Sequence, residues 1–291
     1  MSLKNKSEYI LFNGFVKLFH LTGLKSTRFF ARVLAFIFYY LIPIRKKTVT
    51  GNLAMAFPEK SGKEIGQIAY KAYFSFALTL AEIMCIPFQT AEKIKSWVSC
   101  PKLHLVKEKF EENKGVIFLT AHFGNWELGA CSIGAQLGVP VYVVYKPQRN
   151  VFVGDWINMM REKFGNKTVP LGLSIRNIFK ALVEKKIIGL VGDQRGEPDG
   201  PRVKFMGIDS SVYPGAAVMA LKTKSPIAVA VTERQADYSY YVDINFIDID
   251  ECKGTTEEKV MQINQQYHNI LEACIRRNPE QWLWMHKRWK Y

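Results

Sequence analysis

Short apolar runs alternate along the chain with longer stretches in which apolar residues recur every three or four positions. The runs have strand length and are rich in β-branched and aromatic residues, at residues 115–120, 140–145, 187–191, 226–231 and 241–247. The last helical stretch follows a Thr255-x-x-Glu258 capping box. This alternation predicts an α/β fold, a mostly parallel central sheet flanked by helices.

Helical spacing also dominates the chain before the first run, up to about Met84. Ser174 is placed to cap a helix, and Pro214 suits the first turn of another. No linker, repeat or low-complexity tract divides the 291 residues. We therefore predict a helical, membrane-associating region at 1–50 and one large α/β domain at 51–291.

The N-terminal region carries two apolar patterns. Five residues recur on one helical stripe: Tyr9, Phe12, Phe15, Val16 and Phe19. The run from Val33 to Ile44 is apolar throughout, with cations on both sides, and at 12 residues it is shorter than the roughly 20 that a membrane span needs. We expect both helices to lie in the membrane interface with their cations at anionic headgroups. A buried helix and a true span are the alternatives, and no signal-peptide cleavage site is expected.

Charge narrows the choice of partner. The chain has 40 Lys and Arg against 26 Asp and Glu, a formal net charge of +14, which favours an anionic partner. Nucleic acid is disfavoured, because the cations are spread along the chain and no zinc-finger spacing or RNA-binding aromatic motif occurs. An acidic carrier protein, anionic lipid and a phosphorylated glycolipid fit better.

A histidine and a carboxylate stand together where the first apolar run ends. The run is followed by His122-Phe123-Gly124-Asn125-Trp126-Glu127, and a helix is expected from about Trp126. His122 would then lie at the carboxyl end of a strand, where open α/β sheets bind ligands. A neutral imidazole can take a proton from an alcohol, and a carboxylate bonded to its other nitrogen would fix the tautomer. We predict that His122 is a general base oriented by Glu127; a structural histidine is the alternative.

The sequence gives little support for a serine or cysteine nucleophile. The chain contains no Gly-x-Ser-x-Gly elbow, which argues against a serine lipase. Its five cysteines are scattered, without a zinc or disulfide spacing. The attacking alcohol is therefore expected to come from the substrate, and neither a metal nor a cofactor is predicted.

Several blocks of the chain, taken in order, resemble one enzyme family. The block Thr120–Glu127 resembles the signature of the bacterial lipid A biosynthesis acyltransferases of the late, lauroyl/myristoyl type, part of the wider His-x-x-x-x-Asp/Glu lysophospholipid acyltransferase group. The remaining matching blocks are Gly51–Glu59, Val144–Pro147, Gly192–Arg195 and Gln281–Trp289. The resemblance covers nearly the whole chain.

The resemblance implies acyl transfer from an acyl carrier protein thioester, or acyl-CoA, to a hydroxyl of a lipid A precursor. It places the enzyme on the cytoplasmic face of the bacterial inner membrane, peripheral or monotopic. It also carries over Lys146, Arg161, Asp193 and Gln194 as substrate-binding or site-organising residues. Lys146 and Asp193 each follow an expected strand, so their loops would flank His122 and bind phosphates or sugar hydroxyls of the acceptor.

Two other functions fit the same residues. The segment after Pro147, which reads Gln148-Arg149-Asn150, departs from the expected family pattern, so the acceptor could instead be another glycolipid or an aminoacyl lipid. The second alternative is a basic lipid-binding or carrier-docking protein without turnover, in which the His–Glu pair is structural.

Overall fold

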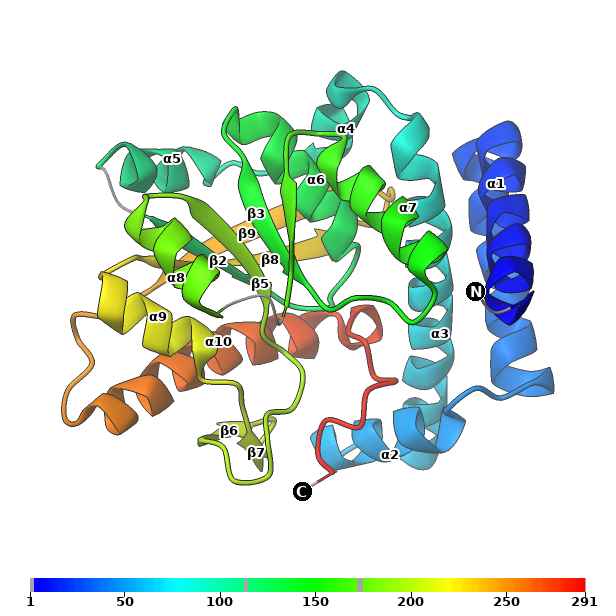
Figure 1. The fold of residues 1–291 in the computed structure, drawn as a ribbon. Helices are drawn as coiled ribbons and strands as arrows, with labels where there is room; N and C mark the ends of the chain where they lie inside the picture. The colour runs from blue at the N-terminus through cyan, green and yellow to red at the C-terminus, as the bar shows by residue number, and fades with distance from the viewer. Residues whose placement is uncertain (1–2, 113–114, 172–174, 291) are drawn as a thin grey trace.

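A seven-stranded sheet forms the centre of the protein (Figure 1). The computed structural model describes residues 3–112, 115–171 and 175–290, with only the backbone of Ile175. The strand order is β1-β9-β8-β2-β5-β3-β4, and every neighbouring pair is parallel except β8–β9. The strands are β1 (Val98–Ser99), β2 (Val116–Thr120), β3 (Val141–Tyr145), β4 (Lys167–Pro170), β5 (Ile187–Val191), β8 (Ile227–Arg234) and β9 (Tyr240–Ile247). The predicted mostly parallel sheet is confirmed.

Each of the five predicted strands is present, and four further strands are not evident in the apolar pattern. β1 and β4 are short edge strands, and β6 (Arg202–Phe205) pairs with β7 (Ile208–Ser211) in a separate hairpin. These segments have two to four residues each, too few to show a period of two in the sequence.

Helices cover both faces of the sheet, because the side chains of each central strand point alternately to opposite sides. In β2, Ile117 and Leu119 face one apolar core, and Val116 and Phe118 face the other. The first core is closed by α8 (Ile175–Val183), α9 (Gly215–Thr223) and α10 (Thr256–Arg277). The second is closed by α4 (Ala91–Trp97), α5 (Leu103–Glu111), α6 (Trp126–Leu137) and α7 (Val151–Glu162).

Local signals set several helix ends. The predicted capping box of α10 is confirmed, with Thr255 and Glu258 each bonded to the other's backbone N–H. Pro214 directly precedes α9, close to the predicted position. Ser174, predicted to cap the helix now seen as α8, lies outside the described residues.

The N-terminal region packs on α3 (Gly62–Cys85), which stands upright beside the sheet (Figure 1). α1 (Leu3–Phe36) is broken at Gly23, whose φ of 73° and ψ of 175° are not helical, and it continues as a π-helix, Ile37–Leu41. Both arms reach the end of α3, since Cys85 contacts Phe19 from the first arm and Thr27 from the second. The two arms of Leu3–Phe36 therefore form a helical hairpin, called the N-terminal hairpin below.

The predicted apolar stripe is helical, but it faces the protein. Tyr9 and Phe12 pack on Phe152 and Trp156 of α7, and Phe19 is buried beside the end of α3. The stripe therefore packs against the rest of the protein, and other apolar residues of the hairpin are exposed, among them Ile10, Leu11, Leu21, Phe29 and Phe36.

By length and composition alone, Gly62–Phe88 could span a membrane, and a bent pair in Leu3–Ala56 could add a second span. However, 61% of the most apolar window of Gly62–Phe88 is buried inside the protein, as expected of a core helix.

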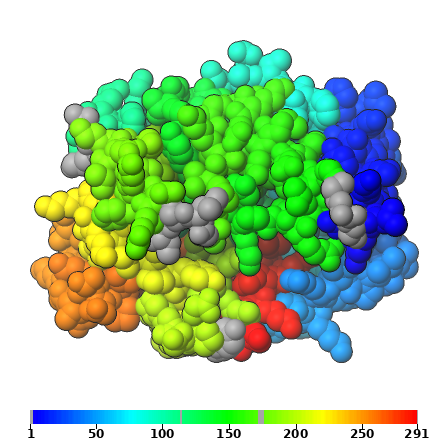
Figure 2. Space-filling model, viewed as in Figure 1, coloured from blue at the N-terminus to red at the C-terminus, as the bar shows by residue number. Residues whose placement is uncertain are grey.

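The C-terminal segment lies over the end of the sheet that holds the carboxyl ends of the parallel strands. It comprises residues 279–290 and begins with a short 3-10 helix, Pro279–Gln281. α2 (Lys46–Ala56) holds it in place: the buried Asn52 donates to the carbonyls of Trp284 (2.9 Å) and His286 (2.7 Å). Figure 2 shows this segment, in red, at the surface between the β6–β7 hairpin and α2.

Candidate functional site

The tight turn between β2 and α6 carries the predicted histidine. Gly124 adopts a φ of 56°, and a Cβ there would lie 2.0 Å from the carbonyl oxygen of Thr232. Only glycine fits such a position. Asn125 caps α6 by accepting a hydrogen bond from the N–H of Leu128 (3.1 Å). His122 therefore sits at the carboxyl end of β2, as predicted, and Glu127 lies in the first turn of α6.

The carboxylate that holds His122 is Asp193. Its Oδ1 lies 2.8 Å from His122 Nδ1, and its Oδ2 accepts from the backbone N–H of His122 (2.9 Å). The indole of Trp282, in the C-terminal segment, also donates to Oδ2 (2.9 Å). The expectation that Glu127 orients the imidazole is therefore wrong: among the described residues no hydrogen bond joins Glu127 to His122.

Sheet topology explains this pairing. β2 and β5 are parallel neighbours, and Thr120 is in register with Val191. His122 and Asp193 each lie two residues beyond that register pair, so both arrive at the same edge of the sheet. Strand order does not follow from a single sequence. For this reason the resemblance implied Asp193 as a substrate-binding or site-organising residue, and its pairing with His122 was not expected.

Two carboxylates influence the protonation of His122. Burial lowers the pKa of His122, but the charge of Asp193 and its hydrogen bond, helped by the charge of Glu127, outweigh burial and raise the pKa above its ordinary value. Asp193 is 3% exposed; burial raises its pKa, but the facing imidazole and three hydrogen bonds hold the pKa below its usual range. The Nδ1 contact assigns the ring proton to Nδ1 and leaves Nε2 as the basic nitrogen.

Glu127 is bound to Arg161 instead. Arg161 Nε and Nη2 donate to the two carboxylate oxygens (2.8 and 2.6 Å), and the two side chains are only 15% and 11% exposed. Glu127 also accepts from the indole of Trp126 (3.3 Å), whose ring meets the His122 ring edge-on with centroids 5.0 Å apart. Glu127 thus acts on His122 by its charge, and it bonds the Trp126 ring that packs on His122. Arg161, predicted to bind substrate, is here bidentate to Glu127, so a direct substrate contact stays a prediction.

The other two carried-over residues lie at the same sheet edge. Lys146 follows β3 and Gln194 follows β5, and both are exposed. Their exposure leaves them accessible to a ligand, and their role in binding stays a prediction.

His122 opens onto a hollow of about 180 Å³ of free space, open in part to solvent. This His122 hollow is lined from α3 by Ser75, Phe76 and Thr79, from the turn by His122, Gly124 and Trp126, and from the C-terminal segment by residues 280–283. This volume includes space open to solvent, and the enclosed part has room for about one water molecule.

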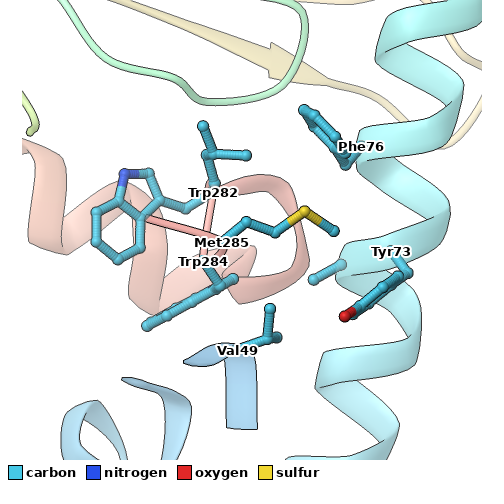
Figure 3. Close-up of a pocket in the computed structure, with 8 residues that line it drawn as sticks. Val49, Tyr73, Phe76, Trp282, Trp284 and Met285 are labelled. Atoms are coloured by element: carbon cyan, nitrogen blue, oxygen red, sulfur yellow. The ribbon is translucent and has the colours of Figure 1, made fainter. Parts of the chain in front are cut away.

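A second hollow, also of about 180 Å³ and open in part to solvent, adjoins the first and shares Phe76, Trp282 and Leu283 with it. Its remaining lining is apolar except for the Tyr73 hydroxyl: Val49, Ala72, Tyr73, Trp284 and Met285. In Figure 3, Tyr73 and Phe76 project from α3 toward the C-terminal segment, and Met285 points back toward α3. We call it the apolar hollow.

Behind the turn lies a buried polar cluster that the sequence did not predict. The fully buried Glu82 accepts from Asn125 Nδ2 (3.1 Å), and Thr79 Oγ1 donates to the carbonyl of Gly124 (2.7 Å). Arg234, at the end of β8, lies 3.8 Å from Glu82. Burial raises the pKa of Glu82, although the charge of Arg234 opposes this. These residues come from α3 and β8, far from the motif in the chain, and no sequence spacing connects them.

Among the described residues, no group of three or more His, Cys, Asp or Glu side chains is placed to bind a metal ion. All five cysteines are buried and free. The site is thus a histidine and an aspartate, with a neighbouring Glu–Arg pair, at a partly apolar opening.

Known proteins share this chain's sequence over most of its length. The profile of the family described as "Bacterial lipid A biosynthesis acyltransferase" matches residues 2–291. The lipid A biosynthesis palmitoleoyltransferase of Escherichia coli is 26% identical over 249 residues, covering 84% of this chain and 79% of the relative. The lipid A biosynthesis lauroyltransferase of the same organism is 25% identical over 252 residues, with the same coverages. A lipid A biosynthesis acyltransferase of Haemophilus influenzae is 26% identical over 244 residues, covering 82% of this chain and 75% of the relative. With a profile match over nearly its whole length, the chain belongs to the bacterial lipid A biosynthesis acyltransferase family and is an acyltransferase.

Proposed function

We propose that this enzyme transfers a fatty acyl chain from an acyl carrier protein thioester to a hydroxyl of a lipid A precursor, with His122 as the general base. The observation that carries the proposal is the His122–Asp193 pair at the opening of the His122 hollow. Asp193 keeps the proton on Nδ1, so Nε2 can take the proton of the acceptor hydroxyl. The names of the relatives and the net charge of +14, which suits an acidic carrier and a phosphorylated glycolipid, support the substrates.

The predicted His122–Glu127 dyad takes a different form in this proposal. His122 and Asp193 form the base, and Glu127 is a positioning residue that holds Arg161 and Trp126. Glu127 also supplies negative charge that favours the imidazolium formed during the reaction.

The function is tested by in vitro transfer from a panel of acyl carrier protein thioesters and acyl-CoAs onto lipid A precursors, with mass spectrometry of the product. His122→Ala is expected to lose activity at least about 10³-fold because no other base replaces it. His104→Ala is the matched control, since His104 lies on α5 and, among the described residues, its ring bonds only the carbonyl of Pro101. Full activity of His122→Ala would refute the base; product on another glycolipid or aminoacyl lipid only would establish the alternative acceptor.

The apolar hollow is the proposed place for the acyl chain. It adjoins the His122 hollow, so the hydrocarbon of a thioester held beside His122 would enter between α3 and the C-terminal segment. The enclosed space there has room for about one water molecule, so the chain must part these walls to enter. Ala72→Phe, which fills the α3 wall, is expected to shift the preferred donor to a shorter chain in the same panel. An unchanged chain-length profile would contradict this placement of the chain.

We also propose that the N-terminal hairpin attaches the enzyme to the cytoplasmic face of the inner membrane. Its two arms expose apolar side chains, among them Leu21 (81% exposed) and Phe29 (62%), close to Lys17 and Lys25. Exposed apolar residues beside cations are typical of helices that bind anionic membrane surfaces.

A further inference from the structure

Ser75 is a buried hydroxyl in the wall of the His122 hollow. It lies on α3, is 4% exposed, and lines the hollow together with Thr79, one turn further along. α3 therefore places a hydroxyl beside the same free space that His122 faces.

Arg234 fixes the position of this hydroxyl. Its Nη1 donates to Ser75 Oγ (2.8 Å), its Nη2 donates to Thr79 Oγ1 (2.8 Å), and its Nε donates to the Tyr240 hydroxyl (2.7 Å). The Arg234 side chain is only 8% exposed, and the carboxylate of Glu82 balances its charge 3.8 Å away. A planar guanidinium with three such anchors has little freedom to move.

The proton of Ser75 has no acceptor among the residues that the structure describes. Within residues 3–112, 115–171 and 175–290, Ser75 Oγ accepts from Arg234 but donates no hydrogen bond, whereas Thr79 Oγ1 donates to the carbonyl of Gly124 (2.7 Å). A buried O–H without an acceptor is costly, and an N–H that donates to its oxygen makes it a stronger donor. The free space available to this O–H is the His122 hollow.

Nearby backbone donors are already engaged. The N–H groups of Phe123, Gly124 and Leu128 donate to Ala121, Gln281 and Asn125 respectively. The start of α6 thus retains the N–H groups of Trp126 and Glu127 as rivals to Ser75, because backbone N–H groups at a helix start can also stabilise an oxyanion.

We propose that Ser75 is a catalytic residue whose O–H donates to the carbonyl oxygen of the acyl thioester, and that Arg234 is its positioning residue. The inference rests on the proposed acyl transfer. His122 Nε2 takes the proton of the acceptor hydroxyl while the hydroxyl oxygen bonds to the thioester carbonyl carbon. The π electron pair of the carbonyl then moves onto the carbonyl oxygen, which Ser75 faces. When the carbonyl re-forms, the C–S bond breaks and the leaving thiolate receives the proton from His122. Hydrogen-bond donors fixed at such an oxygen stabilise the transition state more than the ground state.

Ser75→Ala in the full-length enzyme, assayed with acyl carrier protein thioester and lipid A precursor, tests the assignment. The expected result is a fall in kcat of about 10²-fold to 10³-fold with little change in the KM for the thioester. Ser132→Ala is the matched control: Ser132 is also a fully buried helix serine whose Oγ accepts one side-chain hydrogen bond, from Gln136 (2.7 Å), and it lies outside the hollow. Ser132→Ala is expected to keep the wild-type kcat.

A kcat of Ser75→Ala within about threefold of wild type would overturn the proposal and assign the carbonyl oxygen to the α6 backbone. A rise in KM at constant kcat would also overturn it, because the hydroxyl would then serve ground-state binding only. If Ser75→Ala does not fold, Ser75→Cys, of nearly equal size but with a weaker donor, is expected to lower kcat at least about tenfold; an unchanged kcat would overturn the proposal. Absence of transfer by the wild-type enzyme would reject the proposed function itself.

Discussion

The protonation of His122 is set by opposing influences that each belong to a named residue. Burial favours the neutral ring, and Asp193 and Glu127 favour the charged one, with the carboxylates prevailing. A base of this kind is active when it is neutral, so its pKa decides the pH at which the enzyme begins to work.

The first prediction concerns Asp193. Since the pKa of His122 is raised, the kcat/KM of the wild-type enzyme is expected to increase with pH through a pKa above 6.5, as the imidazolium loses its proton. Asp193→Asn removes the charge that opposes burial, so this ascending limb is expected to move to lower pH, while kcat falls by up to about 10⁴-fold because the tautomer is no longer fixed. A pH profile of kcat/KM for both proteins measures the shift; a limb at the wild-type pH would contradict the role of Asp193.

The second prediction concerns the Glu127–Arg161 pair. Both side chains are largely buried, at 11% and 15% exposed, so removing either one leaves an unpaired charge in a poorly solvated site. Glu127→Gln or Arg161→Gln alone is expected to lower the free energy of unfolding by about 3 to 5 kcal/mol, and the double variant by clearly less than the sum. Urea denaturation of the four proteins in the cycle gives the coupling. Strictly additive losses would show that the pair does not act as a unit.

Among the elements, the turn between β2 and α6 depends on segments from three other parts of the chain. α3 supplies Thr79 to the Gly124 carbonyl, the C-terminal segment accepts the Gly124 N–H at the carbonyl of Gln281, and β8 approaches with Thr232. The turn between His122 and Glu127 is thus held by tertiary contacts from α3, β8 and the C-terminal segment.

The third prediction is that Gly124→Ala disrupts this turn. The new Cβ would meet the Thr232 carbonyl at 2.0 Å, in addition to the unfavourable φ of 56°. Gly138→Ala is the control, because Gly138 has a φ of 72° but nothing lies within 4 Å of its Cβ. Gly138→Ala is expected to cost about 1 kcal/mol of unfolding free energy and to keep activity, whereas Gly124→Ala is expected to cost at least twice that and to lose activity. Equal losses in both variants would show that the approach of β8 is unimportant.

At the scale of the whole molecule, the N-terminal hairpin and the His122 hollow share one helix. α3 packs against the hairpin on one side and lines both hollows on the other. An enzyme attached to a membrane by this hairpin would hold its site at a fixed height above the lipid surface.

The fourth prediction tests the attachment. The double variant Leu21→Asp/Phe29→Asp replaces two exposed apolar residues on either side of the Gly23 break, and its affinity for vesicles containing anionic lipid is expected to fall at least about tenfold. Val183→Asp on α8 is the control, since Val183 is similarly exposed, at 59%, and belongs to another part of the surface. Co-sedimentation with vesicles measures the affinity. Equal binding by all three proteins would place the membrane-binding surface elsewhere.

The sequence alone determined the class of fold, the five main strands and the place of His122. These follow from local information: apolar runs of strand length, a helical period, and turn residues at the end of a strand. The order of resembling blocks also pointed to the family, which the profile match confirms.

Tertiary structure alone decided which carboxylate holds the imidazole. Sequence proximity favoured Glu127, five residues from His122, but Glu127 lies in the first turn of α6 and pairs with Arg161 of α7. Asp193, 71 residues away in the chain, reaches His122 because β2 and β5 are parallel neighbours in register. The direction of the N-terminal stripe was decided in the same way, by the presence of α3 and α7 to pack against. A single sequence specifies which side chains are apolar and where strands end, but the neighbours of each element depend on the free energy of the whole packed chain.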